Sequence, residues 1–309
     1  MSNSKVLITG GAGNVGSALA KELAKDSSNT VVIIDDLSTG NKNKIPALNN
    51  VVFIKADVNN YKDVVPVFGR YNFDYVFHYA AVVGVARTLE NPMSVLEDIE
   101  GIKNILGLSK NTGVKRVFYS SSSEVYGEPF EIPQNEQTTP LNSRLPYAIV
   151  KNVGEAFFRT YYDEYGLEYT IFRFFNTYGP NQSDDFVVPR FLKAAMANEN
   201  ITIYGDGQQT RSFCYVDDNV DTCIKAMHSK NLVNDVINIG SDKEMTILEL
   251  AQSIIKFTKS KSQIVHLPAL PEGDMARRCP DTLKMMQLLD RELISLEEGL
   301  DRLIKFYIK

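Results

Sequence analysis

The first 24 residues restrict the fold of this chain more than any other segment. A short β-branched run at 5–9 is followed by Gly10-Gly11-Ala12-Gly13-Asn14-Val15-Gly16 and then by good helix formers. This order predicts a strand, a glycine turn and a helix. Gly10 suits the tight turn, Gly13 lets the backbone approach a pyrophosphate, and Gly16 lets the helix pack closely on the strand. The helix amino terminus would then face phosphates with free N–H groups.

The glycine pattern alone is weak evidence, because its spacing is GxxGxxG rather than the commoner GxGxxG, and a loop needing positive φ also uses glycine. The next strand, predicted at 30–34, strengthens it by ending in Asp35-Asp36. A carboxylate about 20 residues beyond the glycines accepts hydrogen bonds from adenosine ribose hydroxyls and repels a 2′-phosphate. No arginine follows directly to receive such a phosphate, so the pattern predicts NAD rather than NADP.

Strand-like and helix-like runs alternate through the first half of the chain. This alternation predicts an α/β fold with a Rossmann-type, doubly wound parallel sheet and ligands beyond the carboxyl ends of its strands. After about residue 177 the elements become shorter, so we expect an NAD-binding domain at 1–176 and a smaller α/β substrate-binding lobe at 177–309. The expected strands are 5–9, 30–34, 51–54, 75–79, 115–120 and 169–174, and the expected helices are 14–25, 61–68, 93–112 and 147–165.

Composition excludes several classes of partner. The 309 residues are 44% hydrophobic, which is ample for a core, and the net charge of −5 argues against a nucleic-acid surface. No apolar run approaches the ~20 residues of a membrane span, and the first strand begins too early for a signal peptide. Three cysteines without a CxxC motif indicate a reducing cytoplasm, and three scattered histidines predict no metal site.

A tyrosine and a lysine in the middle of the chain carry the candidate chemistry. Tyr147 and Lys151 are four residues apart and therefore lie on one face of the predicted helix. A free tyrosine has a pKa of about 10, and an adjacent ammonium, helped by a cationic nicotinamide, favours the phenolate. Ser122, at the end of the preceding strand, can share the proton. This trio would take a proton from a substrate hydroxyl while a hydride leaves the same carbon. The alternative is an exposed pair on an ordinary helix.

Together these motifs resemble the extended short-chain dehydrogenases/reductases, and among them the NAD-dependent nucleotide-sugar epimerases, dehydratases and decarboxylases. The resemblance covers essentially the whole chain and also implies that segments of the second lobe return to the first domain. Its further marks are Asp57-Val58, His78-Tyr79-Ala80-Ala81, the segments 173–180, 203–207 and 211–218, and Gly273-Asp274 ahead of Arg277 and Asp281.

The resemblance assigns roles to individual residues. Ser122 would be the hydroxyl partner, Tyr147 the base, and Lys151 the residue that binds the nicotinamide ribose and tunes the tyrosine, with Glu124 as a further catalytic group. The first step would oxidise a sugar C4 hydroxyl to a 4-keto sugar. The residues expected to contact NAD are Gly10, Gly13, Asn14, Val15, Gly16, Asp35, Asp36, Ser38, Gly40, Asp57, Val58, Ala80, Ala81, Tyr147, Lys151 and Phe174.

For a nucleotide-diphosphate sugar, the resemblance implies a second set of contacts. Asn176 would contact the diphosphate, Arg211 and Arg277 would clamp its two phosphates, and Tyr204 would lie near the base. Surface salt bridges are the alternative for the arginines, and a core aromatic is the alternative for Tyr204. In relatives, helices like 93–112 and 147–165 form a homodimer contact, although core packing equally explains their amphipathic pattern. The full substrate set is Val85, Ser123, Asn176, Arg190, Tyr204, Arg211 and Arg277.

Residues 123 and 124 bear on the fate of the sugar after C4 oxidation. A Ser-Glu pair stands here, whereas thymidine-diphosphoglucose-type 4,6-dehydratases carry Asp-Glu and simple 4-epimerases carry small or hydroxyl residues. The pair is similar to that of UDP-glucuronate decarboxylases and GDP-mannose 4,6-dehydratases. Against decarboxylation, Val82–Arg87 replaces a proline-rich segment, although Arg87 could serve a carboxylate. We expect a 4-epimerase or 4-dehydrogenase, with decarboxylation or 4,6-dehydration as the alternative. A non-catalytic dinucleotide sensor is a remote alternative, because such proteins often lose the tyrosine or the lysine and both are present here.

Overall fold

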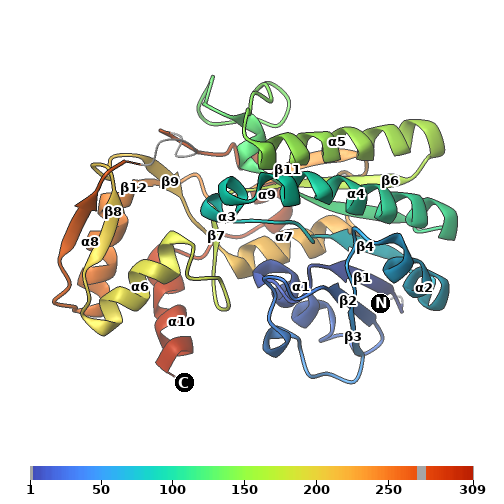
Figure 1. The fold of residues 1–309 in the computed structure, drawn as a ribbon, viewed down its shortest axis with the longest axis horizontal. Coiled ribbons are helices and arrows are strands. Elements are labelled where there is room, and N and C mark those ends of the chain that lie inside the picture. Colours follow the sequence, from blue (N-terminus) through green and yellow to red (C-terminus); the bar gives the residue numbers. More distant parts are fainter. Residues whose placement is uncertain (1–2, 270–275, 309) are drawn as a thin grey trace.

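A parallel sheet forms the centre of the protein. The computed structural model describes residues 3–269 and 276–308. Within these ranges the main sheet has seven strands in the order β11-β6-β5-β4-β1-β2-β3, and every neighbouring pair is parallel (Figure 1). The strands are β1 (Lys5–Thr9), β2 (Thr30–Asp35), β3 (Val51–Lys55), β4 (Tyr75–His78), β5 (Arg116–Ser122), β6 (Glu168–Phe174) and β11 (Asp235–Ile239).

Helices cover both faces of the sheet, which is why the inner strands β1 and β2 are apolar along most of their length. In β1, Val6 and Ile8 belong to one core and Leu7 to the other. The first core includes residues of α1 (Asn14–Leu23), α7 (Val216–His228) and α9 (Leu283–Leu289). The second includes residues of α2 (Tyr61–Tyr71), α4 (Pro92–Thr112) and α5 (Pro146–Tyr165). This is the predicted Rossmann-type fold, and all six predicted strands and four predicted helices are present.

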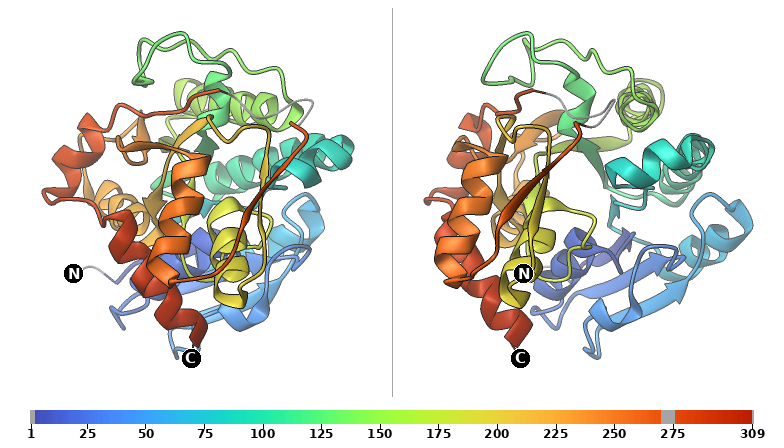
Figure 2. Two further views of the ribbon diagram at one scale, coloured as in Figure 1. Left: turned by 90° about the vertical axis from the view of Figure 1, so that its left-hand side faces the viewer. Right: turned by 60° about the vertical axis from the view of Figure 1, so that its left-hand side comes forward.

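Most of the remaining elements form a smaller lobe, and the others are short connections. Figure 2 shows its yellow, orange and red segments stacked beside the blue strands of the sheet. β8 (Ile201–Tyr204) pairs with β13 (Ile264–Leu267), and β9 (Thr210–Ser212) pairs with β12 (Glu244–Thr246). The helices of this lobe are α6 (Val187–Ala197), α8 (Ile247–Thr258) and α10 (Leu296–Ile308), and the short connections are η1 (Lys42–Lys44), α3 (Val85–Glu90), η2 (Ser123–Tyr126), β7 (Thr177–Tyr178) and β10 (Cys214–Tyr215).

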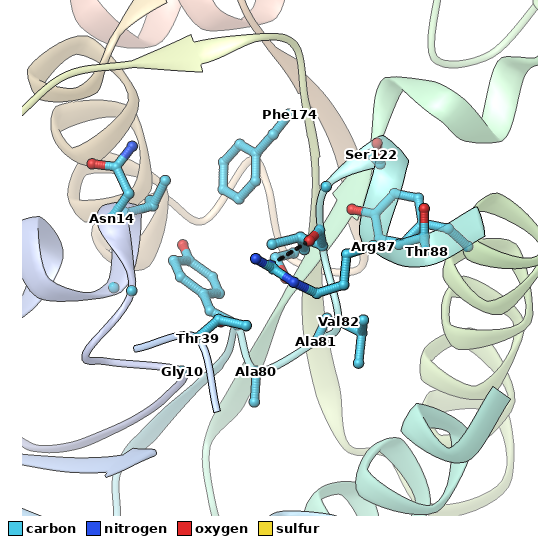
Figure 3. Close-up of a pocket in the computed structure, with 18 of the residues that line it drawn as sticks. Gly10, Asn14, Thr39, Ala80, Ala81, Val82, Arg87, Thr88, Ser122 and Phe174 are labelled. Atoms are coloured by element: carbon cyan, nitrogen blue, oxygen red, sulfur yellow. Dashed lines mark hydrogen bonds between the residues drawn. The ribbon is translucent and has the colours of Figure 1, made fainter. Parts of the chain in front are cut away.

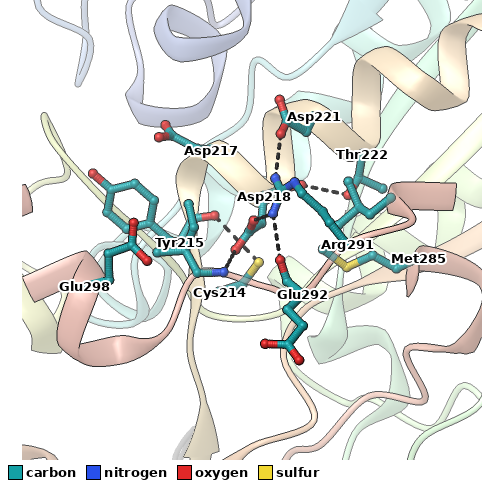
Figure 4. A network of polar contacts seen from close by, with 12 residues as sticks. Cys214, Tyr215, Asp217, Asp218, Asp221, Thr222, Met285, Arg291, Glu292 and Glu298 are labelled. Carbon is teal, nitrogen blue, oxygen red and sulfur yellow. Dashed lines mark hydrogen bonds and ion pairs between the residues drawn. The ribbon is translucent and has the colours of Figure 1, made fainter. Parts of the chain in front are cut away.

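A buried aspartate ties the carboxyl-terminal segment to the helices under the sheet. Asp218, in the first turn of α7, has no exposed surface. Its two carboxylate oxygens accept hydrogen bonds from the Arg291 guanidinium at 2.6 Å and the Ile294 N–H at 2.8 Å, and Arg291 also pairs with Asp221 (Figure 4). Because a buried carboxylate without such partners is costly, this network fixes the path of the chain into α10.

Neither a membrane-spanning helix nor a metal cluster is found in the part of the chain that the structure describes. Among these residues, no helix combines the length and apolar character that a membrane span requires. No group of three or more His, Cys, Asp or Glu side chains in residues 3–269 and 276–308 is arranged to hold a metal ion.

Candidate active site

The glycine turn after β1 is built so that no side chain fits at two of its positions. Gly10 has φ +67°, and a Cβ there would lie 2.7 Å from the backbone nitrogen of Ala80. A Cβ on Gly16 would lie 2.4 Å from the carbonyl oxygen of Gly10. Both distances are shorter than real Cβ contacts, so α1 and the chain after β4 approach the turn only because these residues are glycines.

Asp35, at the end of β2, holds this turn in place. Its carboxylate accepts hydrogen bonds from the N–H groups of Ala12 and Leu37, each at 2.9 Å. Burial raises the pKa of the Asp35 carboxyl, and these two hydrogen bonds lower it again. Asp36 is exposed and accepts hydrogen bonds from the backbone and hydroxyl of Ser38. Both aspartates therefore carry carboxylate oxygens at the edge where the ribose is expected.

A cavity of about 710 Å³ opens at the carboxyl ends of the strands. All the residues expected to contact NAD line it, as do Ser122, Ser123, Glu124 and Asn176. The residues present fit the cofactor, since the glycine cradle excludes Cβ atoms. In addition, Asn14 Oδ1 is buried without a hydrogen-bond partner among the described residues. Figure 3 shows Asn14 and Phe174 on one side of the cavity, with Ala80 and Ala81 on the other.

Ser122, Tyr147 and Lys151 meet in this cavity. Ser122 is the last residue of β5, and the other two lie one turn apart near the start of α5. Lys151 is buried, and its Nζ donates to the Ser120 carbonyl oxygen at 2.6 Å and lies 5.7 Å from the centre of the Tyr147 ring. The alternative of an exposed pair is therefore wrong.

Burial dominates the titration of both side chains. Burial raises the pKa of Tyr147, and the negative charge of Glu124 raises it further. The hydrogen bond with Ser122 and the positive charge of Arg278 lower this pKa, but by less. Burial lowers the pKa of Lys151 to about 8, with Asp98 opposing the change. Among the protein groups alone, burial outweighs the influences that lower the Tyr147 pKa. The lowering expected from Lys151 together with a cationic nicotinamide remains a prediction.

Glu124 faces a residue that the sequence motifs did not single out. Arg278 is buried, lines the cavity, and places one guanidinium nitrogen 3.5 Å from a Glu124 carboxylate oxygen. Glu124 itself lies in η2 directly after β5, and its N–H donates to Ser122 Oγ at 3.2 Å. The sequence signal for this contact is the doublet Arg277-Arg278, in which the family resemblance assigns a role only to the first arginine.

Arg277 makes a salt bridge, which is the alternative to its predicted phosphate contact. It is exposed and pairs with Glu244, with its Nε 2.8 Å from a carboxylate oxygen. It does not line the main cavity as far as the described residues show. Its phosphate contact therefore remains a prediction, and Gly273-Asp274 of the same motif lie outside the described residues.

The other predicted substrate residues are spread around the smaller lobe. Arg211 is buried and donates to the Thr210 carbonyl oxygen at 2.7 Å. Tyr204 lines a second cavity of about 340 Å³, and the guanidinium of Arg190 lies 5.6 Å from its ring centre. The side chain of Val85 lies outside the described residues. Their roles toward a nucleotide sugar remain predictions.

Arg87 is the last residue of Val82–Arg87, the segment that stands in place of the proline-rich segment expected of a decarboxylase. Its guanidinium donates to the Val83 carbonyl oxygen and to Asp185, each at 2.9 Å. Figure 3 shows its side chain pointing into the cavity, so the structure places a second cation in the space beside the cofactor residues.

Comparisons with known proteins agree with this geometry. The sequence model of the NAD dependent epimerase/dehydratase family matches residues 6–240. A UDP-N-acetyl-alpha-D-glucosaminuronate decarboxylase of Bacillus cytotoxicus is 36% identical, over 98% of this chain and 97% of its own. The structure of a Thermotoga maritima UDP-glucose 4-epimerase with UDP-glucose superposes with a TM-score of 0.92 at 31% identity, covering 98% of both chains. A Bacillus cereus UDP-glucuronic acid 4-epimerase with UDP-glucuronic acid and NAD has a TM-score of 0.89 at 29% identity, also over 98% of both.

Proposed function

The chain belongs to the NAD dependent epimerase/dehydratase family and is an NAD-dependent enzyme, and on that premise we propose that it oxidises C4 of a UDP-linked hexuronate and releases the C6 carboxylate as CO2. The observation that carries this proposal is the Glu124–Arg278 pair inside the catalytic cavity. Arg278 is buried and Glu124 is partly buried, and removing a cation from water is unfavourable unless an opposite charge compensates it. Moving a hydride to and from C4 requires neither charge, whereas a substrate carboxylate requires a cation.

The oxidation half of the reaction rests on the trio at the end of β5. Tyr147 removes the proton of the C4 hydroxyl, and Ser122 shares it through their hydrogen bond. Lys151 lies beside the tyrosine and is held by the Ser120 carbonyl oxygen. NAD, when bound, accepts the C4 hydride and later returns it. Gly10, Gly16 and the residues around Asp35 would hold the cofactor there.

The second half follows from the position of the carboxylate. In the 4-keto sugar, the C6 carboxylate is attached to the carbon next to the ketone. The C5–C6 bond breaks, its electron pair forms an enolate over C4 and C5, and CO2 leaves. C5 then takes one proton from solvent. When the hydride is back on C4 of the resulting 4-keto pentose, Tyr147 returns its proton to the C4 oxygen. Arg278 holds the carboxylate with its forked donors, and Glu124 orients that fork.

Epimerisation at C4 is the second candidate, and it is favoured by two observations. The Thermotoga maritima and Bacillus cereus structures that superpose over 98% of this chain are both 4-epimerases. In addition, Arg87 and its neighbours stand where a decarboxylase is expected to carry a proline-rich segment, and they line the cavity. The same oxidation would then be followed by return of the hydride to the opposite face of C4.

The test is to supply the purified enzyme with UDP-glucuronate and UDP-N-acetylglucosaminuronate labelled with carbon-13 at C6. We expect labelled CO2 and a UDP-pentose product. Arg278→Lys and Glu124→Gln should each lower CO2 release by about tenfold or more, since a charged hydrogen bond contributes about 1.5–3 kcal/mol. Epimerisation of UDP-glucose or of either uronate, with no labelled CO2, would overturn decarboxylation in favour of the second candidate.

We also propose that the enzyme is a homodimer. The outer faces of α4 and α5 leave large apolar side chains exposed, with Met93 69% and Tyr165 56% accessible. Leu96, Ile149 and Tyr162 are also exposed on these two helices. Pairing this surface between two copies would bury it. Light scattering should give twice the chain mass, and Met93→Asp should shift it toward the monomer.

A further inference from the structure

One buried amide joins the two chain segments that carry the Glu124–Arg278 pair. Asn238, in β11, has no exposed surface. Its Oδ1 accepts a hydrogen bond from the Tyr126 hydroxyl at 2.7 Å, and its Nδ2 donates to the Gln134 carbonyl oxygen at 2.8 Å. Asn238 is not among the described residues that line the cavity, so its side chain acts on the site through its partners, which also include the Asp281 carbonyl oxygen at 3.4 Å.

The first partner fixes the short helix that bears Glu124. Tyr126 is the last residue of η2, two residues beyond Glu124, and is buried. Its hydroxyl also accepts a hydrogen bond from Arg173 at 2.8 Å. Arg173 in turn is held by a bidentate contact to Glu155, at 2.9 and 2.7 Å. A hydroxyl bonded to a clamped guanidinium and to a buried amide leaves η2 little freedom to move.

The second partner fixes the segment that bears Arg278. Gln134 N–H donates to the Cys279 carbonyl oxygen, and Asp281 N–H donates to the Gln134 carbonyl oxygen, both at 2.8 Å. These two bonds form an isolated β-bridge immediately after Arg278. The Gln134 carbonyl oxygen is also the acceptor for Asn238, so a shift of that amide moves the bridge.

We propose that Asn238 and Tyr126 are positioning residues that hold Glu124 against Arg278, and that they govern the fate of the 4-keto sugar rather than its formation. This inference rests on the proposed function of that pair. The separation of 3.5 Å between the two charged groups is long for a hydrogen bond, so a small displacement of either segment breaks the contact.

The oxidation machinery has supports of its own. Lys151 is fixed by the Ser120 carbonyl oxygen, and Ser122 belongs to the central strand β5. Two contacts join it to the first network: the Glu124 N–H donates to Ser122 Oγ, and Glu155 of α5 accepts a hydrogen bond from Ser121 Oγ at 2.6 Å. Because Lys151 and β5 keep their own supports, loss of the Tyr126 hydroxyl should slow hydride transfer to NAD much less than the step that needs Glu124.

The experiment compares the two half-reactions in Tyr126→Phe and Asn238→Ala. With the enzyme in excess over UDP-glucuronate, the rise in absorbance at 340 nm measures oxidation, and labelled CO2 measures the second half. We expect oxidation within about threefold of the wild type and CO2 release slowed by about 10–100-fold, with reduced cofactor accumulating, because misplacement by about 1 Å has effects of this size. A split between the two rates is a result that general destabilisation does not produce.

Two further variants keep the outcome interpretable. Tyr307→Phe, in α10, removes a buried hydroxyl without a partner among the described residues, and both of its rates should equal those of the wild type. If Glu124→Gln leaves CO2 release unchanged, the proposed function itself fails. A different outcome is that Glu124→Gln blocks CO2 release while Tyr126→Phe and Asn238→Ala slow oxidation and CO2 release equally, or slow neither of them. In that case only the positioning role is overturned.

Discussion

Lys151 should make the stability of this protein rise with pH above neutrality. Burial lowers its pKa from 10.5 to about 8 in the folded chain. Between these values an unfolded chain binds more protons than the folded one, so the free energy of unfolding increases as the pH rises. The side chain is only 4% exposed, and little solvent screening reduces this effect.

The size of the effect follows from the two pKa values. A difference of about 2.5 pH units corresponds to about 3 kcal/mol, because one unit is about 1.4 kcal/mol. At pH 7 the burial of the lysine cation therefore lowers the free energy of unfolding by roughly 3 kcal/mol, and at pH 10 by roughly 1 kcal/mol. In Lys151→Met this contribution is absent. The stability of the wild type relative to this variant should rise by about 2 kcal/mol between pH 7 and pH 10.

The assay is urea unfolding of both proteins without added NAD at pH 7, 8, 9 and 10. Lys115→Met is the control, because Lys115 is exposed and its ion pair with Asp74 raises rather than lowers its pKa. A relative stability of wild type and Lys151→Met that is flat with pH, or that falls, would refute the reasoning. It would mean that the folded protein keeps Lys151 charged at no cost.

Two other variants test the site directly. Tyr147→Phe should lower kcat by about 10²–10⁴-fold while the enzyme keeps NAD, since the base is lost and the cofactor contacts remain. Equal rates would show that Tyr147 is not the base. Gly16→Ala should abolish NAD binding measured by calorimetry, because its Cβ would lie 2.4 Å from the Gly10 carbonyl oxygen. Gly69→Ala, with no atom within 4 Å of the added Cβ, should bind NAD normally and gain up to about 1 kcal/mol of stability.

The cofactor half of the site was predictable because its signals are local. The turn after β1, Asp35 after β2 and the Tyr147–Lys151 spacing each lie within one element and its connection. The order of strands in a doubly wound sheet then brings them to one edge. All of these residues line the same cavity. The seventh strand, β11, was not predicted individually, because it follows a region of short elements and joins the sheet only through β6.

The substrate half was less predictable for a physical reason. The side chain of Arg277 turns to Glu244 while that of Arg278 turns to Glu124, and one residue of register separates these outcomes. Register within the extended segment is set by the bridge between Gln134 and Pro280, which joins residues about 150 positions apart. Only the folded chain shows which arginine faces the cavity. The direction of the Tyr147 pKa shift was not predictable for a similar reason, because burial of the phenol, its largest cause, depends on how distant segments pack around it.

This division between local and long-range contacts bears on how the family varies. In the proposed function, oxidation at C4 depends on residues of β5 and α5. The fate of the 4-keto sugar would depend on Glu124 and Arg278, whose segments are joined through Gln134 and the β11 residue Asn238. A few substitutions near 276–281 could therefore alter the product while NAD chemistry persists. Relatives at similar identity that are named as decarboxylases and as epimerases are the outcome that such an arrangement would produce.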